Sequence, residues 1–334
     1  MPQPRVRLIV TGDDFGYCLR RNRGIMECFN ARAISNVSLL VNGTAAKEAA
    51  ISAVRNKVPL GLHANLSEGL PVCHQLRMGS SLVNKDGFFH GKMGIREVLK
   101  SGHINLSEVD QELRGQVDLF CELTGHLPHH MDGHQHVHVL PGIRDIFAQV
   151  LSDYGIKYTR VPIEPGLRDC DWIGQQLMDF YLQVEKDAFN SIDVFKQHGI
   201  RWADIYIGLT TMGKNMSVSN IQRVIENAIA TRADTSCGKR FQPLQDDTIL
   251  TMELMVHPGY SSFPEEGGCG EGPDEFSMSA DRFLELQTLK ESKLLKYYED
   301  KNIQLCSFKD IKEIGSEKII QREGDEHRLE AFSD

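Results

Sequence analysis

Short apolar segments rich in β-branched residues alternate along the chain with longer segments in which apolar residues recur every three or four positions. The first pattern predicts β-strands, and the second predicts amphipathic helices. We expect strands at residues 7–10, 34–41, 58–66, 128–138, 157–163, 202–209, 248–256 and 303–308. We expect helices at about residues 20–31, 45–56, 106–124, 141–155, 164–198, 216–232 and 280–298.

This alternation is typical of a parallel sheet, because each helix carries the chain back to the edge where the next strand begins. Seven or eight such units in one chain favour an α/β fold with a closed or partly closed (β/α) barrel. We expect a single barrel domain over residues 1–312, with a loop excursion at about 67–104 that shows no clear period. The charged residues 313–334 are predicted to form a flexible tail.

The composition narrows the class of protein. The chain has 334 residues, of which 41% are hydrophobic and 25% charged, and a net charge of −9. A negative balance argues against nonspecific binding to nucleic acid or to an anionic membrane. No apolar run approaches the roughly 20 residues needed to cross a bilayer. The eight cysteines are scattered without a C-x-x-C pair, as expected for reduced thiols in a cytoplasmic protein.

The residues from His130 to His138 place four imidazoles and one carboxylate within nine positions. Imidazole and carboxylate groups bind divalent metals and carry protons near neutral pH. If this segment is a strand, Asp132, His134, His136 and His138 share one face. Alternate residues of a strand are about 6.6 Å apart, so one or two of these imidazoles can bind the same ion. The others would contact substrate or orient the ligands.

Other candidate residues lie at or near the carboxyl ends of predicted strands, where parallel barrels and sheets place their active sites. They are Asp13, Asp14, His63, Arg160 and His257. One carboxylate of the Asp pair could bind a metal while the other acts as a base. Each residue also has a structural explanation: a Gly-Asp-Asp turn, a hydrogen-bonded core histidine, a surface ion pair, or a histidine that caps a turn.

Five motifs together resemble the YdjC family, which includes carbohydrate deacetylases and chito-oligosaccharide deacetylases. They are Thr-Gly-Asp-Asp-Phe-Gly at 11–16, Leu-Val-Asn-Gly at 40–43, Gly-Leu-His at 61–63, Asp-Gly-His-Gln-His-Val-His at 132–138 and His-Pro-Gly-Tyr at 257–260. The resemblance covers residues 5–310. It implies a deformed barrel of the glycoside hydrolase/deacetylase type that hydrolyses the acetyl group from N-acetylated sugars.

The resemblance also implies site roles. Asp13 would be the base, and Asp14, His63 and His134 would bind a metal ion, which in this family is usually magnesium. Similarity to the wider polysaccharide deacetylases implies that Arg160 orients the base and that His257 is the acid. Two imidazoles and one carboxylate suit zinc or another transition metal better than magnesium, so zinc is the alternative ion.

The expected partner is therefore an acetylated mono- or oligosaccharide, with no nucleic acid and no membrane. A homodimer is an assembly that the sequence leaves open. Two other functions remain: a catalytically inactive metal- or sugar-binding protein on the same fold, and hydrolysis of another bond such as a phosphoester. The second ranks low because the chain shows no P-loop or basic phosphate cradle.

Overall fold

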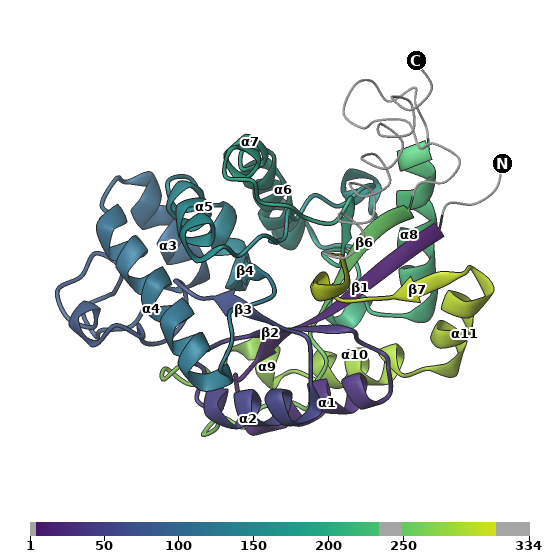
Figure 1. Cartoon of the computed structure of the whole chain (residues 1–334), viewed down its shortest axis with the longest axis horizontal. Helices are drawn as coiled ribbons and strands as arrows, with labels where there is room; N and C mark the ends of the chain where they lie inside the picture. The colour runs from purple at the N-terminus through teal and green to yellow at the C-terminus, as the bar shows by residue number, and fades with distance from the viewer. Residues whose placement is uncertain (1–4, 234–248, 312–334) are drawn as a thin grey trace, which may run out of the picture.

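A parallel β-sheet forms the centre of the protein (Figure 1). The computed structural model describes residues 5–233 and 249–311. Within them, the strand order is β4-β3-β2-β1-β6-β5, and β7 also pairs with β1. The strands are β1 (Arg5–Phe15), β2 (Asn36–Leu39), β3 (Leu60–Ala64), β4 (Met131–Gly133), β5 (Ile205–Ile207), β6 (Ile249–Val256) and β7 (Ile303–Leu305).

All of these strand pairs are parallel, which confirms the expected α/β barrel class as a half-barrel. Residues 157–159 span the space between β4 and the segment that precedes β5. The Met131 N–H donates to the Tyr158 carbonyl (3.0 Å), and the Thr159 N–H donates to the Arg201 carbonyl (2.9 Å). The strand expected at 157–163 is thus reduced to a single bridge, because Pro162 has no N–H to continue a ladder.

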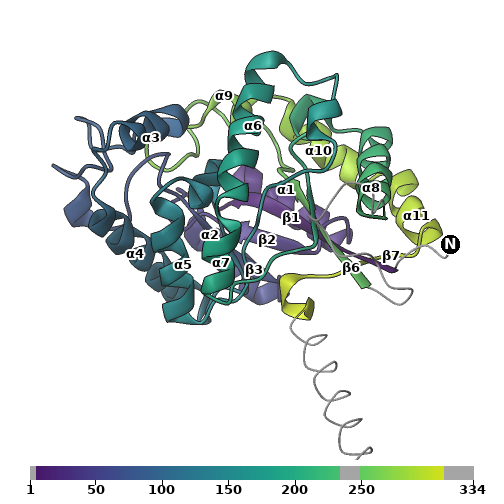
Figure 2. The ribbon, with the colours of Figure 1, turned by 90° about the horizontal axis from the view of Figure 1, so that it is seen from above.

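Helices surround the sheet in both views (Figures 1 and 2). Contacts link them in the order α8, α11, α10, α1, α2, α4, α5 and α7, so each packs on its neighbour around the sheet. Their bounds are α1 (Leu19–Asn30), α2 (Ala46–Asn56), α4 (Leu106–Thr124), α5 (Ile143–Tyr154), α7 (Ile192–Gln197), α8 (Val218–Ala233), α10 (Asp281–Leu289) and α11 (Ser292–Asp300).

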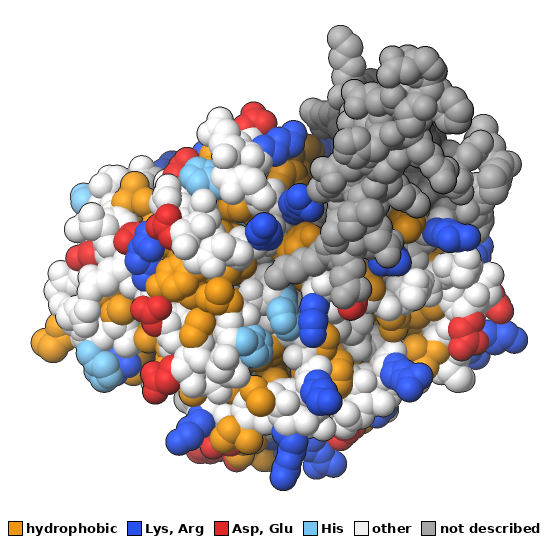
Figure 3. Space-filling view, viewed as in Figure 1, with side chains coloured by type: hydrophobic (Ala, Val, Ile, Leu, Met, Phe, Trp, Pro, Cys, Tyr) orange, Lys and Arg blue, Asp and Glu red, His pale blue; other side chains and the backbone are white. Residues whose placement is uncertain are grey.

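The remaining elements border the carboxyl edge of the sheet or connect the units. They are α3 (Gly91–Lys100), α6 (Gln175–Phe189), α9 (Glu275–Met278) and the 3-10 turns η1 (His74–Leu76), η2 (His134–Val139), η3 (Leu167–Asp169) and η4 (Gly213–Asn215). On the face seen in Figure 3, basic and acidic side chains are interspersed among polar and apolar ones. In the part of the chain that the structure describes, no helix is long and apolar enough to cross a membrane.

Three expectations need correction. The excursion at 67–104 is not only loop, because it contains η1 and the ten-residue helix α3. The helix expected at 164–198 consists of α6 and α7, and that at 280–298 consists of α10 and α11. The tail at 313–334 lies outside the described residues, and the extent of a single domain over 1–312 stays a prediction.

Continuous burial explains why β1 lies at the centre. Leu8, Ile9 and Val10 are fully buried, and β1 is hydrogen-bonded to β2, β6 and β7. A strand covered on both faces is expected to read as an unbroken apolar run rather than an alternating one. The polar residues that follow this run therefore reach the carboxyl edge inside the protein.

Candidate active site

A β-bulge brings Asp13 and Asp14 into the same cavity. Gly12 pairs with Val37 and Phe15 pairs with Leu39, so β1 carries an extra residue opposite β2. Consecutive side chains of a regular strand point to opposite faces, whereas a bulge redirects them. Asp14 adopts a φ of 63°, and both carboxylates line the cavity at the carboxyl edge of the sheet.

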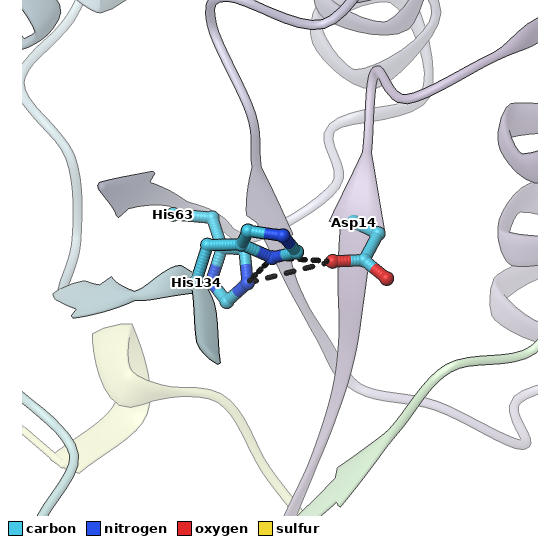
Figure 4. Close-up of side chains that lie close together, drawn as sticks. All are labelled: Asp14, His63 and His134. Atoms are coloured by element: carbon cyan, nitrogen blue, oxygen red, sulfur yellow. Dashed lines mark hydrogen bonds and ion pairs between the residues drawn. The ribbon is translucent and has the colours of Figure 1, made fainter. Parts of the chain in front are cut away.

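Two imidazoles face the same oxygen of Asp14 (Figure 4). Oδ1 of Asp14 lies 3.5 Å from Nε2 of His63 and 3.2 Å from Nδ1 of His134. The two imidazole nitrogens are 3.3 Å apart. All three side chains are buried, and their ligand atoms lie within 4.8 Å of one another, so this group could hold a metal ion. The residues expected to bind metal are therefore close together in the fold.

The electrostatic field around this group favours positive charge. Burial alone would lower the pKa of His63, but Asp132 and Asp13 outweigh it and raise the pKa to about 9. Burial likewise opposes the charged form of His134, yet hydrogen bonds with Asp14 and Glu68 raise its pKa to about 10. A field that stabilises two buried imidazolium ions also favours a bound cation.

Arg160 holds both oxygens of Asp13. Its Nη1 donates to Oδ2 (2.7 Å) and its Nη2 donates to Oδ1 (2.9 Å), in a fully buried, bidentate pair. Nε and Nη2 also donate to Glu253 Oε1, and Nη2 lies 3.0 Å from Asp132 Oδ2. Although burial disfavours the cation, Asp13 and Asp132 hold the pKa of Arg160 above its ordinary value. Arg160 is thus a buried pairing residue and not part of a surface ion pair.

His257 follows β6 and completes the group. Its Nε2 lies 3.9 Å from Asp13 Oδ2. Its backbone is fixed from both sides, because its N–H donates to Glu285 (2.5 Å) and its carbonyl accepts from Arg21 Nη1 (3.1 Å). Burial, together with the nearby cation of Arg282, holds the pKa of His257 well below 6.5. This imidazole is therefore neutral at neutral pH.

The segment 134–138 is not a strand, which corrects the expectation for residues 128–138. After β4 the chain turns sharply through Gln135 and His136, whose φ angles are 53° and 61°. His136 lines the cavity beside His134, whereas Nε2 of His138 donates to the Arg160 carbonyl (2.9 Å). The imidazoles therefore do not share one face, and His138 fixes the backbone that carries Arg160.

A cavity of about 410 Å³ opens over these groups. Ligand pockets of small molecules usually measure about 300–1,000 Å³. Besides the candidate residues, its lining includes the aromatic side chains of Phe180, Tyr181 and Phe276 and the polar side chains of Lys92, Lys214 and Asn215. The cavity can therefore admit a small polar molecule with apolar faces.

Sequence reasoning missed four residues that hold the site. Asp132 Oδ1 lies 2.7 Å from His63 Nδ1, and Glu68 Oε2 lies 2.8 Å from His134 Nε2. Arg282 donates to Asp14 Oδ2 (3.0 Å), and Glu285 accepts from the His257 N–H. Asp132 was noticed only as part of the histidine segment. Arg282 and Glu285 are three positions apart on α10, a spacing that places both on one helix face but does not point to a site.

The fold and the site together define an α/β half-barrel with a buried Asp–His group, able to hold a metal ion, at the carboxyl edge of its parallel sheet. The sequence identifies the family. Residues 7–300 match the family described as YdjC-like protein, and the chain belongs to this family. The resemblance found in the motifs is confirmed.

Curated relatives carry deacetylase names. The chain is 59% identical to a carbohydrate deacetylase of Danio rerio over 93% of this chain and 100% of that protein. It is 46% identical to a carbohydrate deacetylase of Homo sapiens over 93% of each chain. A chitooligosaccharide deacetylase of Serratia marcescens is 37% identical over 41% of this chain and 52% of that protein. These relatives confirm the expectation of a hydrolase that acts on an amide bond.

One solved structure supports the fold. A protein of Enterococcus faecalis, described as a cellobiose-phosphate cleavage protein, superposes with a TM-score of 0.63 and 18% sequence identity. The match covers 92% of this chain and 99% of the other. At this identity the likeness concerns the fold alone.

Proposed function

We propose that this protein is a metal-dependent hydrolase that removes the acetyl group from N-acetylated mono- or oligosaccharides. The observation that supports this most directly is the convergence of Asp14, His63 and His134 beside the Asp13–Arg160 pair and His257. The names of the relatives supply the substrate class, and the cavity has room for a sugar.

The donor set fits a divalent cation. Asp14 Oδ1 is buried, and two imidazole nitrogens face it at 3.5 and 3.2 Å. Asp14 Oδ1, His63 Nε2 and His134 Nδ1 would hold the ion. A bound ion of this kind polarises a carbonyl and lowers the pKa of water. The family resemblance suggests magnesium, whereas two nitrogen donors favour zinc.

Asp13 is the proposed general base. Its Oδ2 is the oxygen that lies 3.9 Å from both His63 Nε2 and His257 Nε2, so this atom faces the reacting centre. A carboxylate oxygen has two lone pairs and can accept a proton while Arg160 still donates to it. Arg160 fixes the plane of the carboxylate through two hydrogen bonds and thereby orients Oδ2.

His257 is the proposed general acid for the departing amine. Because it is neutral at rest, it must take up a proton before it can act as an acid. Asp13 Oδ2 is the neighbouring carboxylate atom, and the proton that it takes from water can pass to His257 Nε2. General acid–base catalysis of this kind typically contributes about 10²–10⁴-fold.

Acetate release tests the proposal. Asp13→Asn should abolish acetate release from an N-acetylated chito-oligosaccharide while the protein keeps its metal and its fold. Asp110→Asn is the matched control, because Asp110 forms a partly exposed pair with Arg114 on α4. Normal turnover by Asp13→Asn would show that the base is another residue. Sugar binding by the wild type without any acetate would instead favour a binding protein.

The identity of the ion needs its own measurement. Protein purified without chelator and without added metal should contain about one divalent ion per chain. Elemental analysis then distinguishes magnesium from zinc. Protein that releases acetate at full rate after exhaustive chelation would contradict metal dependence.

A further inference from the structure

We propose that Glu68 is a positioning residue that fixes His134 for metal binding by holding its outer ring nitrogen. Glu68 Oε2 lies 2.8 Å from His134 Nε2, while His134 Nδ1 faces Asp14 Oδ1. The residue lies in the excursion at 67–104, outside every motif that identifies the family. The inference rests on the proposed metal site and adds a residue that determines its affinity.

The two imidazoles of the site use opposite nitrogens. His63 presents Nε2 to Asp14 and its Nδ1 lies 2.7 Å from Asp132, whereas His134 presents Nδ1 and directs Nε2 to Glu68. A metal-binding histidine commonly donates its outer N–H to a carboxylate, which fixes the ring and makes the inner nitrogen more basic. Glu68 thus has the same relation to His134 as Asp132 has to His63.

Glu68 is itself held in place by several hydrogen bonds. Tyr17 Oη donates to Glu68 Oε1 (2.7 Å), so each carboxylate oxygen has its own partner. Asn65 accepts the Glu68 backbone N–H (3.0 Å) and donates through Nδ2 to the Glu68 carbonyl (2.8 Å). Because backbone and side chain are both fixed, the carboxylate can impose one ring orientation on His134.

The same contacts join the site to the loop that follows β6. The Asp274 N–H donates to Tyr17 Oη (2.8 Å), and Asp274 lines the cavity. The hydroxyl group of Tyr17 is buried. It donates its proton to Glu68, and its oxygen accepts from the Asp274 N–H. The chain of contacts therefore runs from Asp274 in the cavity lining through Tyr17 and Glu68 to His134.

Metal affinity of the unloaded protein is the decisive measurement. Calorimetric titration of metal-free protein with ZnCl₂, and separately with MgCl₂, compares wild type with Glu68→Ala and Glu68→Gln. Loss of an outer carboxylate typically weakens metal binding about 10–100-fold, and we expect this for Glu68→Ala. The metal affinity of Glu68→Gln should lie between those of the wild type and Glu68→Ala, because an amide oxygen can still accept a hydrogen bond from His134.

Glu112→Ala is the matched control. Glu112 is a buried carboxylate that holds the same excursion by accepting the N–H groups of Val72 and Cys73 (2.8 and 2.9 Å), and it has no hydrogen bond to His134. The Glu112→Ala substitution should lower the melting temperature but leave the metal affinity within about twofold of the wild type. This comparison separates positioning of a ligand from general loss of stability.

The outcomes are distinguishable. Wild-type affinity for the ion in Glu68→Ala and Glu68→Gln would overturn the positioning role and leave the metal site intact. A wild-type protein that releases acetate but binds neither ion would overturn the metal site and this inference with it. Weaker binding in both variants, with unchanged affinity in Glu112→Ala, would support Glu68.

Discussion

Nη2 of Arg282 lies 3.0 Å from Oδ2 of Asp14, so one carboxylate oxygen is held by a buried cation while the other faces His63 and His134. Burial raises the pKa of Asp14, but hydrogen bonds with the two imidazoles and the charge of Arg282 outweigh it and hold the pKa well below 3.8. The pair thus keeps Asp14 ionised and leaves Oδ1 directed towards the proposed metal site. Arg282 lies on α10, 268 residues after Asp14 in the sequence.

We expect Arg282→Met to reduce both stability and activity. Removing one partner of a buried ion pair typically costs about 3–5 kcal/mol, because the remaining charge is uncompensated. A bound cation would offset part of this loss, so the effect on urea unfolding should be larger in metal-free protein than in loaded protein. Equal losses in the two forms would argue that Arg282 does not act through Asp14.

Arg160→Met should be at least as damaging, since Arg160 pairs with Asp13, Asp132 and Glu253 at once. We expect a loss of about 3–5 kcal/mol in the free energy of unfolding and little acetate release. Arg160→Lys should fold better yet remain impaired, because one ammonium group cannot pair with both oxygens of Asp13.

The exposed pairs of Arg114 supply the control for this experiment. Arg114 lies 2.9 Å from Asp110 and 2.6 Å from Asp153 at the surface. Arg114→Met should change the free energy of unfolding by about 0–1 kcal/mol. A comparable loss in Arg114→Met and Arg160→Met would mean that burial of the Arg160 pair has no special weight.

Acid should destabilise the fold through His138. Burial lowers the pKa of this imidazole from 6.5 to about 4. Below pH 6.5 the unfolded chain binds a proton at this position that the folded protein does not, so stability is present above 6.5 and is lost as the pH falls towards 4. At about 1.4 kcal/mol per pH unit, His138 contributes a loss of about 2 kcal/mol between pH 6.5 and 5.

His138→Gln tests this contribution, because glutamine does not titrate and its amide can still donate to the Arg160 carbonyl. Urea unfolding of wild type and variant at pH 7, 6 and 5 should show a shallower decline in the variant. Burial also lowers the pKa of His136 and His257, so some decline remains in both proteins. Parallel curves would contradict the role of His138.

A close backbone contact between α1 and the loop after β6 leads to a fourth prediction. A Cβ atom at Gly24 would lie 2.4 Å from Cα of Gly259, two residues after His257. Gly24→Ala must therefore displace the helix or the loop, and we expect it to cost about 1–3 kcal/mol and to lower kcat.

Arg23→Ala, one position earlier on the same helix, is its control. The Arg23 side chain is 73% exposed and pairs with Glu27 at the surface, a contact usually worth about 0.3–0.5 kcal/mol. Thermal unfolding and acetate release should be nearly unchanged in Arg23→Ala. A Gly24→Ala protein as stable and active as Arg23→Ala would contradict the contact.

Periodicity predicted the elements that are buried on both faces. The apolar runs of β1 and β6 stand out because each strand is covered on both sides, and α4 ends at Gly125 in the left-handed conformation, as a glycine stop predicts. The helix α3 escaped prediction because it is only ten residues long, contains Gly91 and Gly94, and buries only Ile95. The segment after β4 was misjudged because nothing in its residue types announces the turn at Gln135 and His136.

Asp13, Asp14, His63, His134, Arg160 and His257 could be proposed from the sequence because each lies at or near the end of a predicted strand. Parallel strands end at one edge, so strand-end residues converge without further information. Glu68 and Arg282 could not be found in this way. Their contacts with His134 and Asp14 join positions 66 and 268 residues apart, and no local pattern records such a pairing.

The sequence by itself determined the alternation of strands and helices, the family and the chemical groups available at one edge of the sheet. The tertiary structure decided which atoms of those groups meet. A bulge turns Asp13 and Asp14 to the same side, and Asp132 and Glu68 occupy the outer nitrogens of the two imidazoles. Local patterns reflect burial along one element, whereas hydrogen-bond geometry in the buried site depends on side chains from several elements packed together.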